Sequence, residues 1–535
     1  MTRARVFRYV FLAAALLFPV PARPAVVSDP PPTVKLESGV LRGGQFGSAA
    51  NEIAFLGIPY AAPPTGDLRW KPPQPLAKWK GTRDATGFGA ACLQAAAPGA
   101  ANFKMSEDCL YLNVWTTEFS SGAKLPVMVW IHGGGNYEGR GQDPPLGAAL
   151  ARMGVVVVSF NYRLGVFGFL AHPALTAESE HHSSGNYGLL DQIEVLKWVR
   201  ANITKFGGDP ENVTIFGESA GASDACLLMA SPLAAGLFHR AILESGDCQG
   251  VLTGTLKTSI PYNFIHGSGE AQGTALSRHF GIAAGSAGEL AKLRAIPADQ
   301  ILQAWIVDPD VIVAAIVDGW VVPEQPALIF AQGKQAPVPI IVGSNADEGT
   351  RFIGRNSPAT IEQYKKYLAR DSGKYSPDEF AAYSAASDAE VPAAYLHLQT
   401  EFFGYGAYSM ARAVARSGQK AYLYYFNYVG PGDYAREGAF HTEELLFLAD
   451  AFPGDWHPSA DDEKLSQAMR RYWVQFAKTG NPNEKRNPVW PPYDPQFEQC
   501  LGLGREIKLR PVPGEERLKA LEKIMKTIVA EVGNN

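Results

Sequence analysis

One stretch of the chain decides the fold: residues 213–229 read VTIFGESAGASDACLLM. Its first four residues form an apolar, β-branched run that is typical of a strand buried on both faces. Its last five residues suit a buried helix. Ser219 stands between the two runs, with glycines at 217 and 221, because only small residues fit two positions before and after a serine on a sharp strand-to-helix turn. The stretch therefore predicts a nucleophilic serine that projects from the end of a strand.

Similar apolar runs lie on both sides of this stretch, at residues 127–131, 155–158, 340–342 and 422–426. Upstream of residue 213, Ile193, Leu196 and Val199 recur every three or four residues, which is the spacing of one helix face. The order strand, helix, strand implies a parallel sheet and an α/β fold. No internal repeat or long linker interrupts the chain, so we expect one folded unit over residues 32–535.

A serine hydroxyl is a weak nucleophile until a base takes its proton. Of ten histidines, His441 is one candidate among several; it lies in residues 438–444 (GAFHTEE), between an aromatic strand-like run and an apolar helical stretch. The base also needs a carboxylate, which in folds with this turn falls between the serine and the histidine in the sequence. Glu348 and its neighbour Asp347 both fit, and sequence order alone does not decide between them.

Residues 132–135 read HGGG and directly follow the apolar run 127–131. Successive glycines after a strand leave backbone N–H groups free to meet a substrate. We expect the N–H groups of Gly134, Gly135 and Ala220 to bind the oxygen anion of a tetrahedral intermediate. A plain flexible turn would explain one or two glycines better than three. Neither a Walker motif nor a dinucleotide motif fits the run, and we expect no cofactor and no metal ion.

Together these residues resemble the type-B carboxylesterase/lipase family, which includes bacterial para-nitrobenzyl esterases and is related to the cholinesterases. The likeness covers nearly all of the mature chain. Its motifs in chain order are 55–60 (FLGIPY), 68–70 (LRW), 106–113 (SEDCLYLN), 161–163 (NYR), 206–210 (FGGDP), the serine turn, 318–319 (DG), 347–349 (DEG), His441, Trp473 and 479–482 (TGNP). The resemblance implies an α/β-hydrolase fold, with a large, mostly parallel central sheet flanked by helices, and it implies ester hydrolysis.

The resemblance also assigns roles to single residues. It makes Glu348, rather than Asp347, the acid of a catalytic triad with Ser219 and His441. It further implies a buried network that stabilises the charge on His441, formed by Glu218, Ser245 and Glu444.

Two departures from the family pattern stand out. Cholinesterase-like sites place a tryptophan in the loop that corresponds to residues 93–108, where it holds a quaternary ammonium group. This loop contains no tryptophan, so choline esters are not the expected substrate. Asp224 stands where relatives usually carry an apolar residue, and a buried carboxylate needs a partner or a raised pKa. Either a nearby Arg or Lys, or a polar channel, would satisfy it.

The five cysteines lie at positions 92, 109, 226, 248 and 500. Cys92 and Cys109 flank a loop rich in Ala, Gly and Pro, and a disulfide between them would stabilise the fold by about 3 kcal/mol. We expect that pair to be bonded, and the resemblance supports it. Cys226, among apolar neighbours, is expected to be a small buried apolar residue without a disulfide. The pairing of Cys248 and Cys500 stays open.

The first 22 residues have the pattern of a signal peptide: three arginines precede an apolar run from Tyr9 to Phe18 and a stretch of small residues. An uncleaved N-terminal anchor is the alternative. No later run reaches the roughly 20 apolar residues of a membrane span. The protein is thus expected to be secreted or periplasmic, with no membrane span once the signal peptide is cleaved.

Composition and charge narrow the function classes. With 48 basic and 53 acidic residues the formal net charge is −5, and no basic block is present, so nucleic acid is not an expected partner. The leading hypothesis is a serine carboxylic-ester hydrolase that acts on short to medium acyl or aryl esters through an acyl-enzyme. A lipase or a detoxifying esterase for a bulky ester or carbamate is the alternative. A non-catalytic binding protein on the same fold is a more distant one. Nothing in the sequence predicts the oligomeric state.

Overall fold

The computed structural model describes residues 30–95, 103–249, 253–258, 267–354, 357–372 and 383–533. The signal peptide expected at residues 1–22 lies outside these ranges. No helix in the described part of the chain is both long and apolar enough to cross a bilayer.

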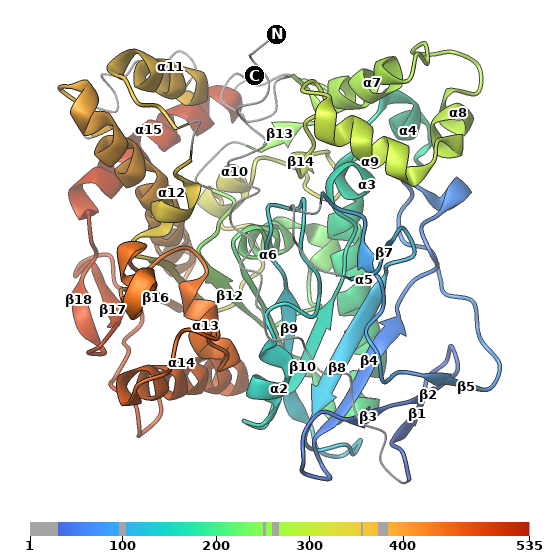
Figure 1. The fold of residues 1–535 in the computed structure, drawn as a ribbon, viewed down its shortest axis with the longest axis horizontal. Coiled ribbons are helices and arrows are strands. Elements are labelled where there is room, and N and C mark those ends of the chain that lie inside the picture. Colours follow the sequence, from blue (N-terminus) through green and yellow to red (C-terminus); the bar gives the residue numbers. More distant parts are fainter. Residues whose placement is uncertain are drawn as a thin grey trace.

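Within the described ranges, an eleven-stranded sheet runs through the molecule (Figure 1). From one edge to the other its strands are β18 (Lys508–Pro511), β17 (Gln499–Leu503), β16 (Ala421–Phe426), β15 (Ile340–Asn345), β12 (Arg240–Glu244), β11 (Gly208–Glu218), β9 (Leu125–Ile131), β10 (Val156–Phe160), β8 (Tyr111–Thr116), β4 (Ile53–Pro59) and β3 (Gly44–Gln45).

The strands from β17 to β10 are parallel to their neighbours, whereas β18 at one edge and β8, β4 and β3 at the other are antiparallel. This confirms the predicted α/β-hydrolase fold with a large, mostly parallel sheet. All five apolar runs singled out in the sequence coincide with its parallel strands, except that Val155 comes one residue before β10. Because parallel strands end at the same edge of a sheet, the loops after β9, β11, β15 and β16 meet on one side.

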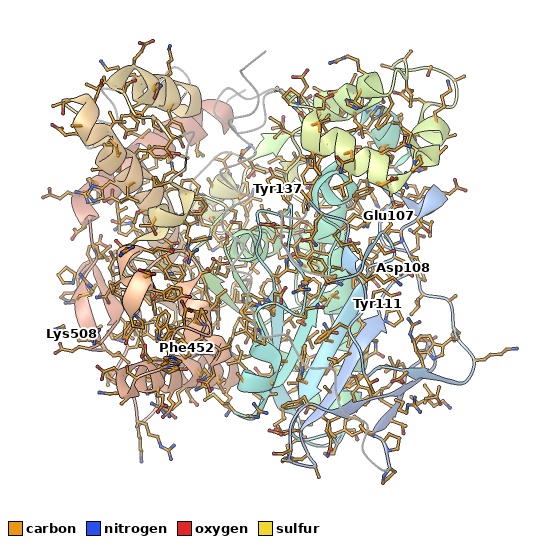
Figure 2. The ribbon with its side chains drawn as sticks, viewed as in Figure 1. Glu107, Asp108, Tyr111, Tyr137, Phe452 and Lys508 are labelled. Carbon is orange, nitrogen blue, oxygen red and sulfur yellow. A yellow bond between two sulfur atoms is a disulfide. The ribbon has the colours of Figure 1, made fainter. Side chains whose placement is uncertain are left out.

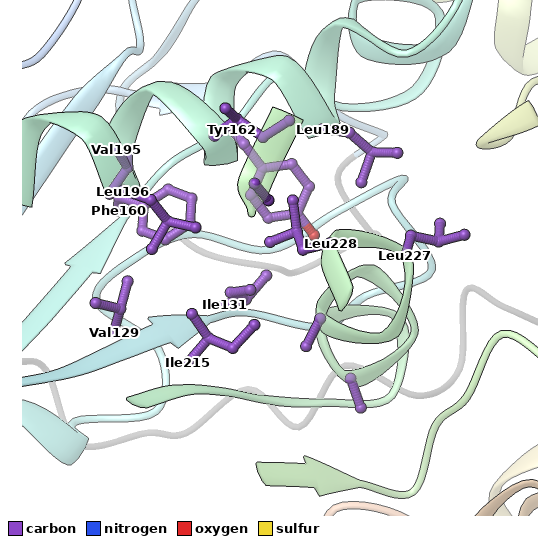
Figure 3. Close-up of a cluster of buried hydrophobic side chains, with 14 of the residues drawn as sticks. Val129, Ile131, Phe160, Tyr162, Leu189, Val195, Leu196, Ile215, Leu227 and Leu228 are labelled. Atoms are coloured by element: carbon purple, nitrogen blue, oxygen red, sulfur yellow. The ribbon is translucent and has the colours of Figure 1, made fainter. Parts of the chain in front are cut away.

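Helices cover both faces of the sheet because successive side chains of a strand point to opposite sides. On β9, Val129 and Ile131 pack toward one face, where α5 (Tyr187–Asn202), α6 (Ala220–Ala230) and α12 (Val391–Arg416) lie. Figure 3 shows Ile131 and Ile215 of the sheet beneath leucines of α5 and α6. Met128 and Trp130 pack toward the other face, against α2 (Leu146–Ala151), α13 (Glu443–Ala449) and α14 (Ala460–Thr479).

The remaining elements surround this core. In Figure 1, α7, α8 and α9 form one group at the top and α11, α12 and α15 another. The other helices are α3 (Gly165–Phe169), α4 (Pro173–Glu178), α7 (Gly269–His279), α8 (Glu289–Ala295), α9 (Ala298–Val307), α10 (Pro326–Ala331), α11 (Ile361–Ser372) and α15 (Glu515–Gly533). Small sheets are formed by β1 (Thr33–Lys35), β2 (Val40–Arg42) and β5 (Thr82–Asp84), by β6 (Ala91–Cys92) and β7 (Met105–Ser106), and by β13 (Gly254–Thr255) and β14 (Ile316–Val317).

Two disulfides are present in the structure. One joins Cys92 to Cys109, the pair favoured by the sequence. The other joins Cys226 to Cys248, so the expectation that Cys226 is an unbonded apolar residue was wrong. Cys226 is buried in α6, which packs beside β12, and Cys248 lies just after the end of that strand. Apolar neighbours in the sequence are equally compatible with a buried thiol and a buried disulfide. Cys500 is buried and free.

Candidate active site

Ser219 occupies a one-residue turn between β11, which ends at Glu218, and α6, which begins at Ala220. Its backbone has φ 55° and ψ −123°, a conformation that a non-glycine residue rarely adopts. The turn is tightly packed: a Cβ on Gly217 would lie 2.5 Å from the carbonyl carbon of Gly221, and a Cβ on Gly221 would lie 2.1 Å from the oxygen of Ile131. The two glycines are therefore required, as expected for a strained serine at the end of a strand.

The glycine-rich segment after β9 lies against this serine. A Cβ on Gly133 would be 3.2 Å from the Cβ of Ser219. Gly134 and Gly135 both have positive φ, 97° and 65°, and among the described residues their N–H groups have no hydrogen-bond acceptor. Ala220 is the first residue of α6, where the N–H has no acceptor within the helix. Gly133 therefore lies against Ser219, and the next two residues, Gly134 and Gly135, carry backbone N–H groups without an acceptor among the described residues.

His441 lies in the loop between β16 and α13 and is 1% exposed. Its Nδ1 is 2.5 Å from Oε2 of Glu348, which is fully buried. The other oxygen of Glu348 accepts the backbone N–H of Asn345 at 2.7 Å. Both oxygens of this carboxylate are therefore used, and one orients the imidazole, as the acid of a triad must.

Asp347, the rival acid, faces another way. Its Oδ2 accepts the backbone N–H of Ala439 at 2.9 Å and lies beside Gly438. The geometry thus brings Glu348 to His441 and leaves Asp347 to bind the backbone just before the histidine.

The second ring nitrogen of His441, Nε2, is 3.1 Å from Oε1 of Glu218, but the two atoms do not meet in hydrogen-bond geometry and neither has another partner among the described residues. Glu218 thus lies beside the ring of His441 and directly precedes Ser219 in the chain. The hydroxyl of Ser219 makes no hydrogen bond within the described part of the chain. Catalytic hydrogen bonds are often long or misaligned without substrate and tighten in the reacting complex.

Two phenylalanines pack on the ring of His441, a contact that the sequence did not predict. The ring centres of Phe403 and Phe352 are 4.7 and 5.1 Å from that of the histidine. Phe352 belongs to the short 3₁₀ turn that begins at Glu348, so its position follows from that segment. Phe403 comes from α12, and nothing in the sequence near the motifs signals it.

The residues expected to support His441 differ in how they reach it. Glu218 touches the ring, whereas Glu444 is linked through Asn345, whose side-chain amide donates to Glu444 Oε2 and to the carbonyl of Phe440. Ser245 is fully buried at the end of β12, with φ 51°, and its hydroxyl has no partner among the described residues. Asn345 is the member of this network that the sequence did not reveal.

Several buried carboxyl groups surround the histidine and have raised pKa values. Burial, followed by the charges of neighbouring carboxylates, raises the pKa of Glu218 and of Glu444 well above the usual value. Burial also raises the pKa of Glu244 to about 8, although its Oε1 accepts the indole N–H of Trp473 at 3.1 Å. Removal from water penalises the charged form of each group. Burial therefore favours the neutral form of each of these carboxyl groups.

Asp224 has two hydrogen-bond partners among the described residues, and neither is an Arg or Lys. The carboxylate is fully buried on α6, and its oxygens accept hydrogen bonds from the side-chain amides of Asn136 and Gln192 rather than from Arg or Lys. Trp320, two residues after Asp318, is partly buried and stacks on His181 with ring centres 3.8 Å apart.

The segment after Gly135 also extends the site. Tyr137 lies near the middle of the molecule in the view of Figure 2, and its ring centre is 5.5 Å from that of Trp305 on α9. Aromatic side chains thus lie next to His441 and in the segment that follows the glycines at 133–135.

Comparison with known proteins agrees with this geometry. Residues 30–521 match the carboxylesterase family model. The chain is 38% identical over 527 residues to the fumonisin B1 esterase of Sphingopyxis macrogoltabida, covering 95% of this chain and 93% of that protein. It is 35% identical to the para-nitrobenzyl esterase of Bacillus subtilis, over 87% of this chain and 94% of that one.

Solved structures give the same result. A para-nitrobenzyl esterase structure superposes with a TM-score of 0.77 at 32% identity and covers 94% of this chain and 100% of its own. A carboxylesterase of Geobacillus stearothermophilus superposes with a TM-score of 0.76 at 32% identity, over 91% of this chain and 99% of its own. The chain therefore belongs to the carboxylesterase family of α/β-hydrolases and is a serine carboxylic-ester hydrolase.

Proposed function

We propose that Ser219, His441 and Glu348 form the catalytic triad of this esterase. Ser219 attacks the ester carbonyl while Nε2 of His441 takes its proton, and the imidazolium then gives that proton to the departing alcohol. Glu348 holds Nδ1 of the ring and stabilises its positive charge. Water then enters, and the same histidine acts as base to release the acid from Ser219. The contact between His441 Nδ1 and Glu348 Oε2 carries this assignment.

The oxygen anion of each tetrahedral intermediate is assigned to the N–H groups of Gly134, Gly135 and Ala220. Support comes from the close approach of Gly133 to Ser219 and from the free N–H groups on either side of the serine. Donors of this kind act because they are already oriented when the charge develops, and each contributes about 3 kcal/mol to lowering the barrier. In this arrangement Glu218, Ser245 and Glu444 stabilise the protonated histidine.

The proposed substrates are short to medium acyl or aryl esters. The aromatic rings of Phe352 and Phe403 beside His441 support an apolar acyl or aryl moiety. The fumonisin B1 esterase named above, which is similar over 95% of the chain, favours a bulky ester of the fumonisin B1 type as a second candidate.

We also propose that the enzyme is secreted or periplasmic. Two disulfides support an oxidising compartment. The arginine-rich and then apolar sequence of residues 1–22 supports export by a signal peptide.

Hydrolysis of p-nitrophenyl esters of increasing acyl length tests the mechanism. Wild-type protein should show a burst equal to one acyl group per active site, followed by steady turnover, and Ser219→Ala should lose both. Ser121→Ala, which changes an exposed serine, is the control and should match wild type. Activity that survives in Ser219→Ala would overturn the triad.

A second assay separates the two substrate candidates. Fumonisin B1 and p-nitrophenyl butyrate are compared at equal enzyme concentration by kcat/KM. A preference for fumonisin B1 of tenfold or more supports the bulky ester, and the reverse preference supports the simple one.

A further inference from the structure

Asp224 is a buried carboxylate that the proposed mechanism does not use. It stands five residues after Ser219 on α6 and is fully buried. Its Oδ1 accepts from Nδ2 of Asn136 at 2.9 Å, and its Oδ2 accepts from Nε2 of Gln192 on α5 at 2.5 Å. No cation balances its charge within the described ranges. Burial raises the pKa of this carboxyl to about 7, against the effect of the two amide donors.

Asn136 links this carboxylate to the oxyanion loop, because it directly follows Gly135. Its φ of 61° is one that asparagine tolerates better than most residues. Its Oδ1 accepts from the hydroxyl of Tyr162 at 2.9 Å, and its backbone oxygen accepts from the N–H of Gly165 at 2.7 Å. Each polar atom of the Asn136 side chain is therefore held by a buried partner.

Asp224 connects the helix that follows Ser219 to the loop that carries Gly134 and Gly135. The helix that carries it, α6, also supplies Ser219 at its start and the N–H of Ala220. The loop that carries Asn136 supplies the N–H groups of Gly134 and Gly135. A hydrogen bond between Asp224 and Asn136 thus fixes the distance between two sets of donors that lie more than eighty residues apart in the sequence.

An isolated buried carboxylate is a costly way to stabilise a core, since an apolar residue of similar size is often as good or better. An apolar residue, however, could not accept the hydrogen bonds that Asp224 receives from Asn136 and Gln192. We propose that Asp224 is a positioning residue, which accepts a hydrogen bond from Asn136 and thereby holds Gly134 and Gly135 in register with Ser219. This inference rests on the proposed oxyanion role of those glycines.

The test compares two substitutions at position 224 in the full-length mature protein, with kcat expressed per active site from the burst amplitude. Asp224→Ala removes the acceptor. Because a displacement of about 1 Å can slow catalysis about a hundredfold, kcat should fall about 10- to 100-fold, with KM changed less than about threefold.

Asp224→Asn is the matched rescue. Its oxygen can still accept from Asn136, and its amide can donate to Oε1 of Gln192, which has no partner among the described residues. Its kcat should stay within about threefold of wild type. This result separates loss of the acceptor from loss of the charge.

A third variant removes the other partner. Asn136→Gly keeps a residue that tolerates the positive φ and deletes the side chain. It should lower kcat as Asp224→Ala does, and the double variant should be no slower than the slower single one, because the two side chains act through one bond. If Asp224→Ala fails to fold, Asn136→Gly and Asp224→Asn carry the test.

Two results would overturn the proposal: a wild-type kcat in Asp224→Ala or in Asn136→Gly, or equal losses in Asp224→Ala and Asp224→Asn. Ser219→Ala, measured beside them, keeps the two proposals apart. If it stays active, the proposed triad fails; if it is inactive while the Asp224 variants behave as wild type, only the positioning role fails.

Discussion

At the scale of the residue, the carboxyl groups around His441 differ in what they do. Glu348 contacts Nδ1 of the ring directly. Asp347, its neighbour in the sequence, points elsewhere and accepts a hydrogen bond from the backbone of Ala439. Both side chains are carboxylates, so they differ only in the direction in which they point. The catalytic effect of a carboxylate depends on its contact with the ring, and substitutions at these two positions should therefore diverge.

Glu348→Gln and Asp347→Asn form a matched pair. Because an amide in place of the triad acid leaves the imidazole in the wrong tautomer, Glu348→Gln should lower kcat by about three to four orders of magnitude. Asp347→Asn keeps an oxygen that can accept from Ala439, and its kcat should stay within about tenfold of wild type. The measurement is kcat and KM for p-nitrophenyl acetate at pH 8. A larger loss in Asp347→Asn than in Glu348→Gln would mean that the acid has been misassigned.

Glu244 gives a prediction for stability. Burial raises its pKa from 4.5 to about 8, so between these pH values the folded protein keeps a proton that the unfolded chain releases. The free energy of unfolding therefore falls as pH rises through this window, by about 1.4 kcal/mol for each pKa unit and a few kcal/mol in all.

Glu244→Gln removes this titration and keeps an oxygen that can accept from Trp473. The variant and wild type should have similar stability at pH 4.5, and the variant should be more stable at pH 9. Urea unfolding at the two pH values measures the difference. A gap that is the same at both pH values would show that Glu244 does not titrate in this range.

At the scale of the element, the strand-turn-helix unit of β11 and α6 positions Ser219, the proposed nucleophile, and its geometry depends on the space around two glycines. The oxygen of Ile131, at the end of the neighbouring strand β9, fills the position that a Cβ of Gly221 would take. The turn that carries Ser219 therefore packs directly against the backbone at the end of β9, and no space is left there for an added side chain.

Gly221→Ala should accordingly disturb both stability and rate. Overpacking of this kind costs about 1 to 3 kcal/mol, and separation of the loop from Ser219 should lower kcat tenfold or more. Gly122→Ala is the control, because a Cβ at that glycine meets no atom within 4 Å. Thermal unfolding and ester hydrolysis report the two effects, and a fully active Gly221→Ala would contradict the tight packing.

The disulfide between Cys226 and Cys248 ties α6 to the segment after β12 across 22 residues of sequence. Closing a loop of this length should stabilise the fold by about 3 kcal/mol. Cys226→Ala/Cys248→Ala should lower the free energy of urea unfolding by that amount. A reductant should lower the stability of wild type by more than that of the variant, which keeps only the disulfide between Cys92 and Cys109. Equal sensitivity of both proteins to the reductant would point to Cys92 and Cys109 instead.

At the scale of the whole molecule, the sheet brings distant segments to one edge. β15 and β16 are parallel neighbours, with Asn345 paired to Phe426. The segments that follow them, which carry Glu348 and His441, therefore leave the sheet side by side. The same holds for β9 and β11, because the glycines proposed to bind the oxyanion follow β9 and Ser219 follows β11. The site is assembled by strand order, and helices on both faces bury the strands that define it.

The sequence by itself determined the features whose cause is local. Apolar β-branched runs mark the buried strands, and the glycines around Ser219 and at 133–135 mark turns that only small residues can form. The order of serine, acid and histidine, with the family motifs around them, was enough to name the candidate triad.

Only the tertiary structure decided which side chains meet across the chain. Asp347 and Glu348 are chemically alike and adjacent, and the path of the loop beyond β15 selects which one faces the ring. The partners of Cys226 and Asp224 lie on segments whose proximity follows from the packing of α6, and no local pattern encodes that packing. Contacts between residues far apart in the sequence depend on how whole helices and strands are placed relative to one another. That placement is set by the burial of both faces of the sheet, which requires the entire chain to fold.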